Sequence, residues 1–229
     1  MEQLPNGLTL SVPADVFPLS TDSMVLARFA RLPRNAHVLD LGSGCGTLGL
    51  LLCASDPGCH VTGLEISPAA HAAAEENILS NGLQARMKSI CADLRSFSSL
   101  PAPGSMDVCI SNPPYFSGGP ESVRNPAARR EDHCTAEDLF AAAARSLKYG
   151  GDLFLVHRPE RLGDLIARAA SHGLEAKRLL LLRHRADGPI ALIFLSFRKG
   201  GKPGLILEEQ ALHDTAGEAT AFFREVYHI

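Results

Sequence analysis

Residues 37–52, HVLDLGSGCGTLGLLL, contain the pattern that decides the fold. A short apolar segment runs into Gly42, Gly44 and Gly46, and leucines then recur at helical spacing. This order predicts a strand, a tight turn and a helix, because glycine has no Cβ and lets the backbone bend sharply. The backbone of such a turn can approach a ligand closely, and the helix N-terminus that follows attracts anionic groups. We therefore expect a ligand-binding βα unit here.

The same alternation continues along the chain. Ser67 and Thr135 suit the N-caps of two helices, Gly150 and Gly151 are expected to stop the second of these, and the turn at 187–188 suits a hairpin. Strands alternating with helices predict a mostly parallel sheet covered on both faces. We expect a single doubly wound Rossmann-like α/β sheet of seven strands, mostly parallel with an antiparallel C-terminal hairpin. The expected strands are 37–42, 60–66, 85–94, 106–112, 152–159, 175–184 and 188–199.

Length and composition indicate one soluble domain. The chain has 229 residues, of which 45% are hydrophobic and 21% charged. We expect the domain to span 35–229, with 1–34 forming an extension and a helix packed on the ligand site. No apolar run reaches the ~20 residues of a membrane helix, and the first ten residues lack the basic and apolar regions of a secretory signal. The six cysteines have no metal-ligand spacing, so we expect a cytoplasmic protein with reduced thiols, no membrane segment and no metal.

Charge is distributed unevenly along the chain. Residues 1–123 carry 6 Lys/Arg against 11 Asp/Glu, residues 124–202 carry 15 against 9, and residues 203–229 carry 1 against 5. A basic segment in a chain of net charge −3 can form a phosphate-binding face. A solvated surface with uneven helices explains the same pattern, so charge alone leaves both alternatives open.

The glycine-rich turn by itself fits two ligands. Gly44, Gly46 and Gly49 satisfy the GxGxxG pattern of dinucleotide-binding proteins, which would indicate a nicotinamide enzyme. Asp40, however, precedes the first glycine by two residues, where a carboxylate would repel a pyrophosphate but could orient an ammonium group. Glu65 ends the next expected strand, where its two oxygens can accept from both hydroxyls of a ribose. Acidic groups in these places favour a cationic nucleoside such as S-adenosylmethionine, with Asp93 after the third strand placed to accept from an adenine amino group.

The segment SNPPYF, residues 111–116, ends the fourth expected strand at the same edge of the sheet. Pro113 and Pro114 stop the strand and keep its last carbonyls out of sheet pairing. An aromatic amine is a weak nucleophile because its lone pair is delocalised into the ring. The side-chain oxygen of Asn112 and the carbonyl of Pro113 can accept its two N–H groups and stabilise positive charge on nitrogen. Tyr115 or Phe116 can stack on the planar target, so the segment predicts an amine-binding clamp.

The stretches DLGSGCG, GLEI and SNPPYF resemble the class I S-adenosylmethionine-dependent N-methyltransferases of the NPPY type. Later stretches, including AARREDHCTAEDLF and LVHRPERLGDLI, are similar to the bacterial tRNA adenine-N6 methyltransferases, which act on the adenine beside the anticodon of a valine tRNA. The resemblance implies S-adenosylmethionine as cofactor, S-adenosylhomocysteine as product and RNA as substrate. It implies Asn112, Pro113, Pro114 and Tyr115 at the target amine. The cofactor residues expected are Asp40, Gly42, Gly44, Gly46, Glu65, Ile66, Asp93, Leu94 and Asn112.

The basic loop VRNPAARRED follows the clamp and departs from the family pattern at one place. The family commonly has Ala-Arg-His-Glu where this chain has Ala-Arg-Arg-Glu at 128–131. Contact with RNA phosphates survives this change, whereas the choice of base is open. We expect Phe116, Arg124, Arg129 and Arg130 to contact the RNA.

Three functions stay open at this point. The first is a monomeric enzyme that methylates the N6 amine of an adenine in tRNA. The second is the same chemistry on another amine, either guanine N2 in rRNA or a glutamine side chain in a protein. The third is a non-catalytic paralogue that binds RNA or S-adenosylmethionine, although the intact clamp argues against it.

Overall fold

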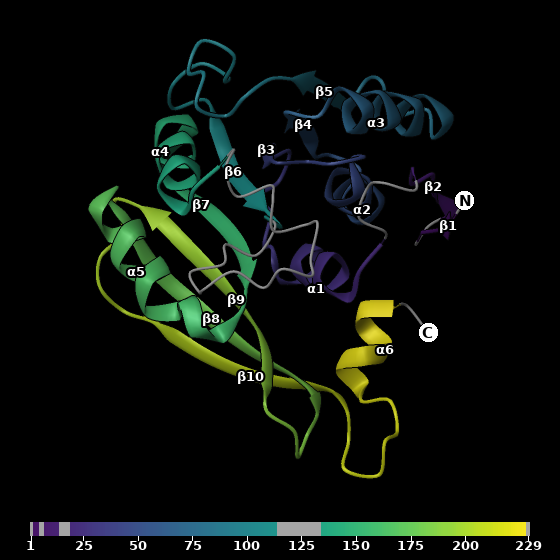
Figure 1. Cartoon of the computed structure of the whole chain (residues 1–229), viewed down its shortest axis with the longest axis vertical. Helices are drawn as coiled ribbons and strands as arrows, with labels where there is room; N and C mark the ends of the chain where they lie inside the picture. Colours follow the sequence, from purple (N-terminus) through teal and green to yellow (C-terminus); the bar gives the residue numbers. More distant parts are fainter. Residues whose placement is uncertain (1, 5–6, 14–18, 114–133, 228–229) are drawn as a thin grey trace, which may run out of the picture.

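One eight-stranded sheet with helices on both faces forms the core of the computed structural model, which describes residues 2–4, 7–13, 19–113 and 134–227 (Figure 1). The strand order is β10-β8-β9-β7-β6-β3-β4-β5. The strands are β3 (His37–Leu41), β4 (His60–Glu65), β5 (Met87–Cys91), β6 (Met106–Ser111), β7 (Leu147–His157), β8 (Leu174–Arg185), β9 (Ile190–Lys199) and β10 (Ile206–His213).

The sheet is doubly wound around β3. From β3 the chain passes to β4 and β5 on one side and then returns to β6 and β7 on the other, and all these neighbours pair in parallel. Strand β9 is antiparallel to both β7 and β8. The predicted mostly parallel sheet and its C-terminal hairpin are confirmed. The reversal of strand order between β3 and β6 creates the place where ligands bind in such sheets.

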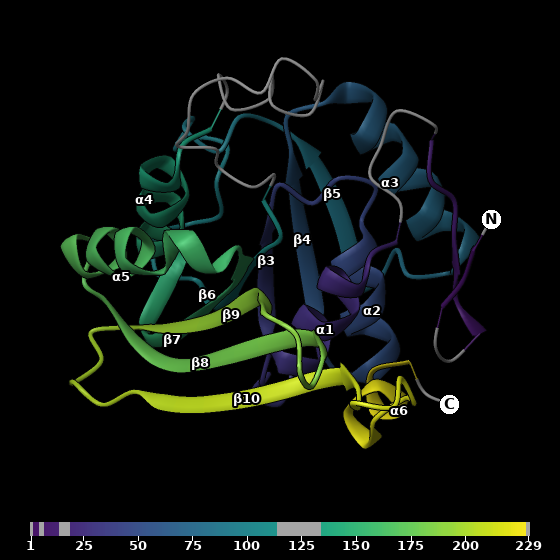
Figure 2. The same ribbon diagram turned by 60° about the horizontal axis from the view of Figure 1, so that its bottom comes forward.

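Helices cover the two faces of the sheet as separate layers (Figure 2). Along β3, Val38 belongs to one hydrophobic core and Leu39 to the other, as the alternation of a strand requires. The first face packs against α1 (Thr21–Phe29), α2 (Thr47–Ser55), α3 (Pro68–Ser80) and α6 (Ala221–Tyr227). The second face packs against α4 (Ala136–Ser146) and α5 (Leu162–Ser171), which follows the 3-10 helix η3 (Pro159–Arg161).

Local sequence explains where these helices begin. The side chain of Ser67 accepts from the backbone N–H of Ala70 at 3.4 Å, and Pro68 occupies the first turn of α3. Thr135 and Asp138 form a reciprocal capping box at the start of α4. Both caps were predicted, and each satisfies backbone donors that the first turn of a helix leaves unpaired.

The end of α4 differs from the prediction. We expected Gly150 and Gly151 to stop this helix, but α4 ends at Ser146 and β7 begins at Leu147. The glycines instead lie within the strand. Gly150 has a φ of +81°, and a Cβ on Gly151 would lie 2.8 Å from the backbone oxygen of Asp107 in β6. Close approach of β6 and β7 therefore requires glycine at this point.

The sheet also has one strand more than the predicted seven. Strand β10 pairs in parallel with the outer side of β8 and is followed by α6. Half of the residues of this strand are exposed, including Ile206 and Leu207 at 60% and 66%, and only Leu212 is buried. Because an edge strand buries so little, its sequence lacks the alternating pattern on which strand prediction depends.

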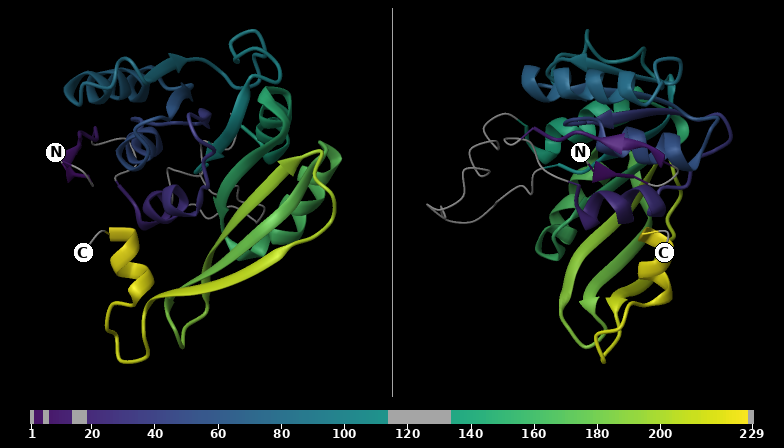
Figure 3. Two further views of the ribbon diagram at one scale, coloured as in Figure 1. Left: turned by 180° about the vertical axis from the view of Figure 1, so that it is seen from behind. Right: turned by 90° about the vertical axis from the view of Figure 1, so that its right-hand side faces the viewer.

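The two ends of the described chain lie on the same side of the molecule. Figure 3 shows α6 beside α1, and the hydroxyls of Thr21 and Tyr227 are 2.6 Å apart. Near the other end, β1 (Glu2–Gln3) and β2 (Thr9–Leu10) form a small antiparallel sheet. Within the described ranges, no helix has the length and hydropathy needed to cross a membrane.

Candidate active site

The carboxyl ends of β3, β4 and β6 bring three predicted site segments to one edge of the sheet. The glycine-rich loop follows β3, Glu65 is the last residue of β4, and Asn112 directly follows β6. Because β3 lies between β4 and β6, the loop is flanked by the other two segments. The structure thus assembles residues that are up to about 70 positions apart in sequence.

The loop has a shape that only glycine adopts without strain. Gly42, Gly44 and Gly46 have φ values of +76°, +55° and +87°. The backbone N–H groups of Gly42 and Ser43 both donate to the carbonyl of Leu64, at 2.9 and 3.0 Å. A Cβ built on Gly42 or Gly44 would meet no described atom within 4 Å. The backbone therefore faces open space, which suits close approach of a ligand.

Glu65 holds this loop in place. One carboxylate oxygen accepts from the N–H of Gly44 and the other from the N–H of Ser67, both at 2.8 Å. Each oxygen retains a second lone pair, so the carboxylate can still accept from the two hydroxyls of a ribose. Contact with ribose thus stays a prediction, and the structure adds an organising role for Glu65 that the sequence did not indicate.

Asp40 supplies a buried carboxyl group beside the loop. It is 1% exposed, and neither oxygen has a hydrogen-bond partner among the described residues. Burial, followed by the nearby charge of Glu65, raises the pKa of Asp40 to about 8. The Ser43 hydroxyl is also buried without a partner in the described chain. Unsatisfied acceptors of this kind are costly unless a ligand pairs with them, and a cationic, hydrogen-bond-donating ligand fits the site.

The residues expected at the adenine differ in how accessible they are. Ile66 is 47% exposed, unusual for a large apolar side chain, and can cover a planar ring. Leu94 is partly buried against the second core. Asp93 forms an ion pair with Arg95 at 2.5 Å, with its side chain 28% exposed. An adenine amino group would have to share this carboxylate with Arg95, which the sequence did not indicate.

The predicted clamp begins with Asn112, whose side chain is hydrogen-bonded to α1. The side-chain nitrogen of Asn112 donates to the hydroxyl of Ser23, in the first turn of α1, at 3.1 Å. With the nitrogen bound to α1, the amide oxygen is left as an acceptor for an incoming amine. Pro113 is buried. The other predicted target and RNA residues lie outside the described residues: Pro114, Tyr115, Phe116, Arg124, Arg129 and Arg130.

Ser23 was missed by sequence reasoning. It is 7% exposed and lies beside the buried Met24 and Val25 of α1, and its backbone N–H donates to the side chain of the cap residue Ser20. A small polar residue on an apolar helix face was the available signal. Its partner could not be known, because α1 and β6 are separated by about 80 residues of sequence.

Replacing Ser23 by alanine is expected to lower turnover about tenfold, because Asn112 loses the contact that fixes its amide. Affinity for the cofactor should change little. The measurement is the single-turnover rate beside calorimetric affinity for S-adenosylhomocysteine. Ser20→Ala is the matched control, since it removes the α1 cap and a 3.5 Å contact with the Ser23 hydroxyl but keeps that hydroxyl as the acceptor for Asn112. Equal losses of rate in the two variants would assign the effect to α1 stability rather than to amide orientation.

His157 lies at the same edge of the sheet as Asn112. Ser111 pairs with Leu155 of β7, so His157 stands two residues farther toward the same edge. Its Nδ1 accepts from the N–H of Arg158 at 2.8 Å. Burial, followed by the charge of Arg161, lowers the pKa of His157 to about 4, so the imidazole is neutral at physiological pH.

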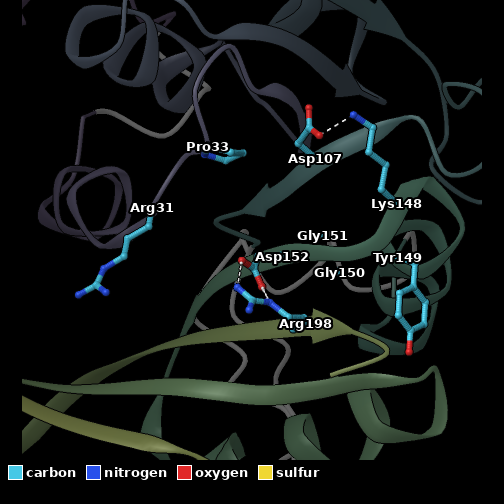
Figure 4. A pocket seen from close by; sticks show the side chains of 9 residues that line it. All are labelled: Arg31, Pro33, Asp107, Lys148, Tyr149, Gly150, Gly151, Asp152 and Arg198. Carbon is cyan, nitrogen blue, oxygen red and sulfur yellow. Dashed lines mark hydrogen bonds and ion pairs between the residues drawn. The ribbon is translucent and has the colours of Figure 1, made fainter. Parts of the chain in front are cut away.

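A separate cavity of about 370 Å³ opens at the opposite end of these strands (Figure 4). Asp107, the second residue of β6, pairs there with Lys148 at 2.5 Å, and Asp152 pairs with Arg198 at 2.8 Å. Figure 4 shows the two side chains of each pair pointing toward one another, joined by dashed lines. The acidic side chains are thus neutralised locally, and the cavity lies away from the carboxyl ends that carry the candidate site. No cluster of metal-ligating side chains occurs in the described part of the chain.

Comparison with known proteins identifies the family. Residues 19–164 match the family model described as Methyltransferase small domain. The chain belongs to this methyltransferase family. The predicted S-adenosylmethionine-dependent methyltransferase is thereby confirmed, and the nicotinamide enzyme suggested by GxGxxG was the wrong alternative.

Relatives of this methyltransferase span almost its whole length. It is 30% identical over 215 residues to the tRNA1(Val) (adenine(37)-N6)-methyltransferase of Bacteroides fragilis, covering 91% of this chain and 90% of the relative. The protein of that name from Edwardsiella ictaluri is 30% identical, with 91% and 84% covered. Among solved structures, the crystal structure of a protein from Agrobacterium tumefaciens, described as a predicted O-methyltransferase, superposes with a TM-score of 0.75. The two chains are 22% identical, and the match covers 91% of this chain and 96% of that one. The last likeness confirms the fold alone.

Replacing Glu65 by alanine is expected to weaken binding of S-adenosylhomocysteine by ~1.5–3 kcal/mol, the usual value for a hydrogen bond to a charged group. The loop should also loosen, because Gly44 loses its acceptor. Calorimetry measures the affinity, and Glu65→Gln is the control that keeps the shape while removing the charge. An unchanged affinity in Glu65→Ala would exclude Glu65 from the cofactor site.

Proposed function

We propose that this methyltransferase methylates the exocyclic N6 amine of an adenine in tRNA, at position 37 of a valine tRNA. The observation that carries the proposal is the hydrogen bond from the Asn112 side-chain nitrogen to Ser23, which leaves the amide oxygen as an acceptor. It occurs in a chain that is 30% identical, over 91% of its length, to an enzyme named for this reaction. The same chemistry on guanine in rRNA, or on a glutamine side chain, has no observation in its favour. A cytoplasmic monomer, with residues 1–34 packed on the cofactor site, is part of the proposal.

The cofactor site is proposed to consist of residues that the strand ends bring together. S-adenosylmethionine, when bound, supplies an electrophilic methyl group on a cationic sulfur. Asp40 is buried beside the loop with both oxygens available to an ammonium group, and the open backbone at Gly42 and Gly44 leaves space for the ligand. Glu65 is proposed to accept from the ribose, with Ile66, Asp93 and Leu94 around the adenine. Gly46 closes the loop and starts α2.

Asn112 and Pro113 are proposed to prepare the target amine. Each would accept one N–H of the amine, so that the nitrogen lone pair points away from the ring plane and toward the methyl donor. Acceptors in fixed positions stabilise positive charge as it develops on nitrogen, and they need no reorganisation at that moment. The contact with Ser23 supports this role, because it fixes the amide of Asn112 before substrate binds. Pro114, Tyr115 and Phe116 are proposed to complete the clamp, with an aromatic ring stacked on the base.

The experiment that tests the function uses methyl-labelled S-adenosylmethionine and total tRNA. We expect label in tRNA, located by mass spectrometry of nuclease fragments at adenine 37 of a valine tRNA. The control is the same reaction with ribosomal RNA and with a protein extract. Label in rRNA guanine or in glutamine would support the second function instead. Cofactor binding without transfer to any substrate would support the non-catalytic paralogue.

The RNA contacts are proposed to come from Arg124, Arg129 and Arg130. An anticodon loop presents unstacked bases, which lowers the cost of moving one base into the clamp. The chief alternative is an arginine rim on β8, comprising Arg178, Arg183 and Arg185. These three side chains form ion pairs with Glu208, Glu209 and Asp187, at 2.9, 2.6 and 3.2 Å. Because these partners neutralise the charge of the rim, we favour the loop at 124–130 as the RNA-binding segment.

Replacing both Arg129 and Arg130 with alanine is expected to make RNA binding less dependent on salt. A plot of log affinity against log salt concentration should lose the slope of about one to two phosphate contacts, at about −0.7 per phosphate. Cofactor affinity should be spared. The measurement is RNA affinity against salt concentration, with Arg183 and Arg185 replaced together as the matched control. Parallel plots for wild type and the loop variant, with a shallower plot for the control, would place the RNA on the rim.

A further inference from the structure

Asn77 of α3 and Asn81, the C-cap residue of this helix, bind the backbone of the N-terminal segment. Asn81 accepts from the N–H of Thr9 at 2.8 Å and donates to its carbonyl at 2.7 Å. One turn earlier, Asn77 accepts from the N–H of Ser11 at 2.8 Å and donates to its carbonyl at 2.9 Å. The two amides thus pair with alternate residues of an extended chain, as the edge of a neighbouring strand would.

Asn77 makes one contact that Asn81 does not. Its side-chain nitrogen also donates to the carbonyl of Cys45 at 3.0 Å, inside the glycine-rich loop. Both hydrogens of the Asn77 amide are therefore used, and the side chain is 2% exposed. Hydrogen bonds shielded from water in this way are strong and leave a costly unpaired group when one partner is removed.

The loop is consequently held from two directions. Glu65 accepts from the N–H of Gly44, and Asn77 donates to the carbonyl of the next residue, Cys45. Gly44 and Gly46, on either side of Cys45, have positive φ values, so this segment would otherwise sample many conformations. Fixing the peptide before the ligand arrives reduces the entropy lost on binding.

We propose that Asn77 is a positioning residue for the cofactor, which ties the N-terminal segment to the glycine-rich loop and holds the loop in its binding shape. The proposal rests on the cofactor site proposed above and is independent of the RNA substrate. Asn77 acts through the backbone of Cys45. The N-terminal segment contributes by covering the Asn77 amide and keeping water from it.

The test compares Asn77→Ala with Asn81→Ala in the full chain. Each variant removes two of the hydrogen bonds that hold the backbone of the N-terminal segment, but only Asn77→Ala also removes the bond to the loop. We expect the dissociation constant for S-adenosylhomocysteine to rise about tenfold or more in Asn77→Ala and less than about threefold in Asn81→Ala. Calorimetry is done at a temperature where melting curves show every variant folded. In methyl-transfer assays, Asn77→Ala should raise KM for S-adenosylmethionine while kcat at saturation changes little.

Each outcome bears on one claim. Wild-type protein that binds no S-adenosylhomocysteine would overturn the cofactor site itself. Equal affinities in wild type and Asn77→Ala, or equal losses in the two variants, would overturn the role of Asn77. If Asn77→Ala does not fold, Asn77→Ser replaces it, because the smaller polar side chain admits water to the backbone groups. Its affinity should lie below that of Asn81→Ala, and an affinity at or above that of Asn81→Ala would overturn the proposal.

Discussion

Asn112→Ala is expected to lower the single-turnover rate of methyl transfer by about 100-fold or more. The amide oxygen is needed most when positive charge develops on the amine nitrogen, so its loss acts on the transition state. Affinity for S-adenosylhomocysteine should stay within a few-fold, although Asn112 borders the cofactor site. Rapid mixing of enzyme, cofactor and saturating tRNA measures the rate, and calorimetry measures the affinity.

The structure supplies a graded comparison for this experiment. Ser23→Ala leaves the acceptor of Asn112 present but free to rotate, so its loss of rate should be clearly smaller than that of Asn112→Ala. Combining the two substitutions should cost little more than Asn112→Ala alone, because Ser23 acts through the amide. A near-normal rate in Asn112→Ala would refute the amine clamp. Additive losses would show that Ser23 acts by another route.

The sequence predicted those elements of the fold that have a clear local pattern of apolar, glycine or proline residues. The strand and glycine turn at 37–46, the acidic end of β4 and the proline stop after β6 lie where they were expected. These are short-range signals, because turns and the alternation of buried positions depend on residues that are adjacent in sequence. Parallel pairing then follows from the alternation of strands and helices, which brought the three segments to one edge.

The sequence could not predict contacts that depend on distant segments. The bond from Asn112 to Ser23, the bond from Asn77 to Cys45 and the bond from Gly44 to Glu65 all join residues made neighbours only by the fold. Strand β10 was missed for a related reason, since pairing with β8 stabilises it more than any pattern of its own. A polar side chain on an apolar helix is ambiguous until its partner is known.

Asp40→Asn is expected to stabilise the cofactor-free protein at about pH 8 and leave its stability nearly unchanged at low pH. The pKa of Asp40 is raised to about 8 in the folded state, whereas an unfolded aspartate titrates near 4. Between these values the native protein holds a proton that the unfolded chain has lost, so stability falls as pH rises through this window. At pH 7 the resulting loss in the free energy of unfolding is roughly 4 kcal/mol. Asparagine resembles the protonated acid and does not titrate, so the variant avoids this loss.

The same substitution should weaken cofactor binding and remove its pH dependence. In wild type a bound cation favours ionised Asp40, so affinity for S-adenosylmethionine should rise with pH and level off at about 8, where the free carboxyl group is already ionised. In Asp40→Asn no proton is released, and the affinity should be lower and flat over this range. Melting temperatures and calorimetric affinities from about pH 5 to pH 9 measure both effects. If the variant is no more stable than wild type at high pH, burial does not destabilise ionised Asp40. If it also binds the cofactor with the wild-type pH profile, Asp40 is not paired with the cofactor.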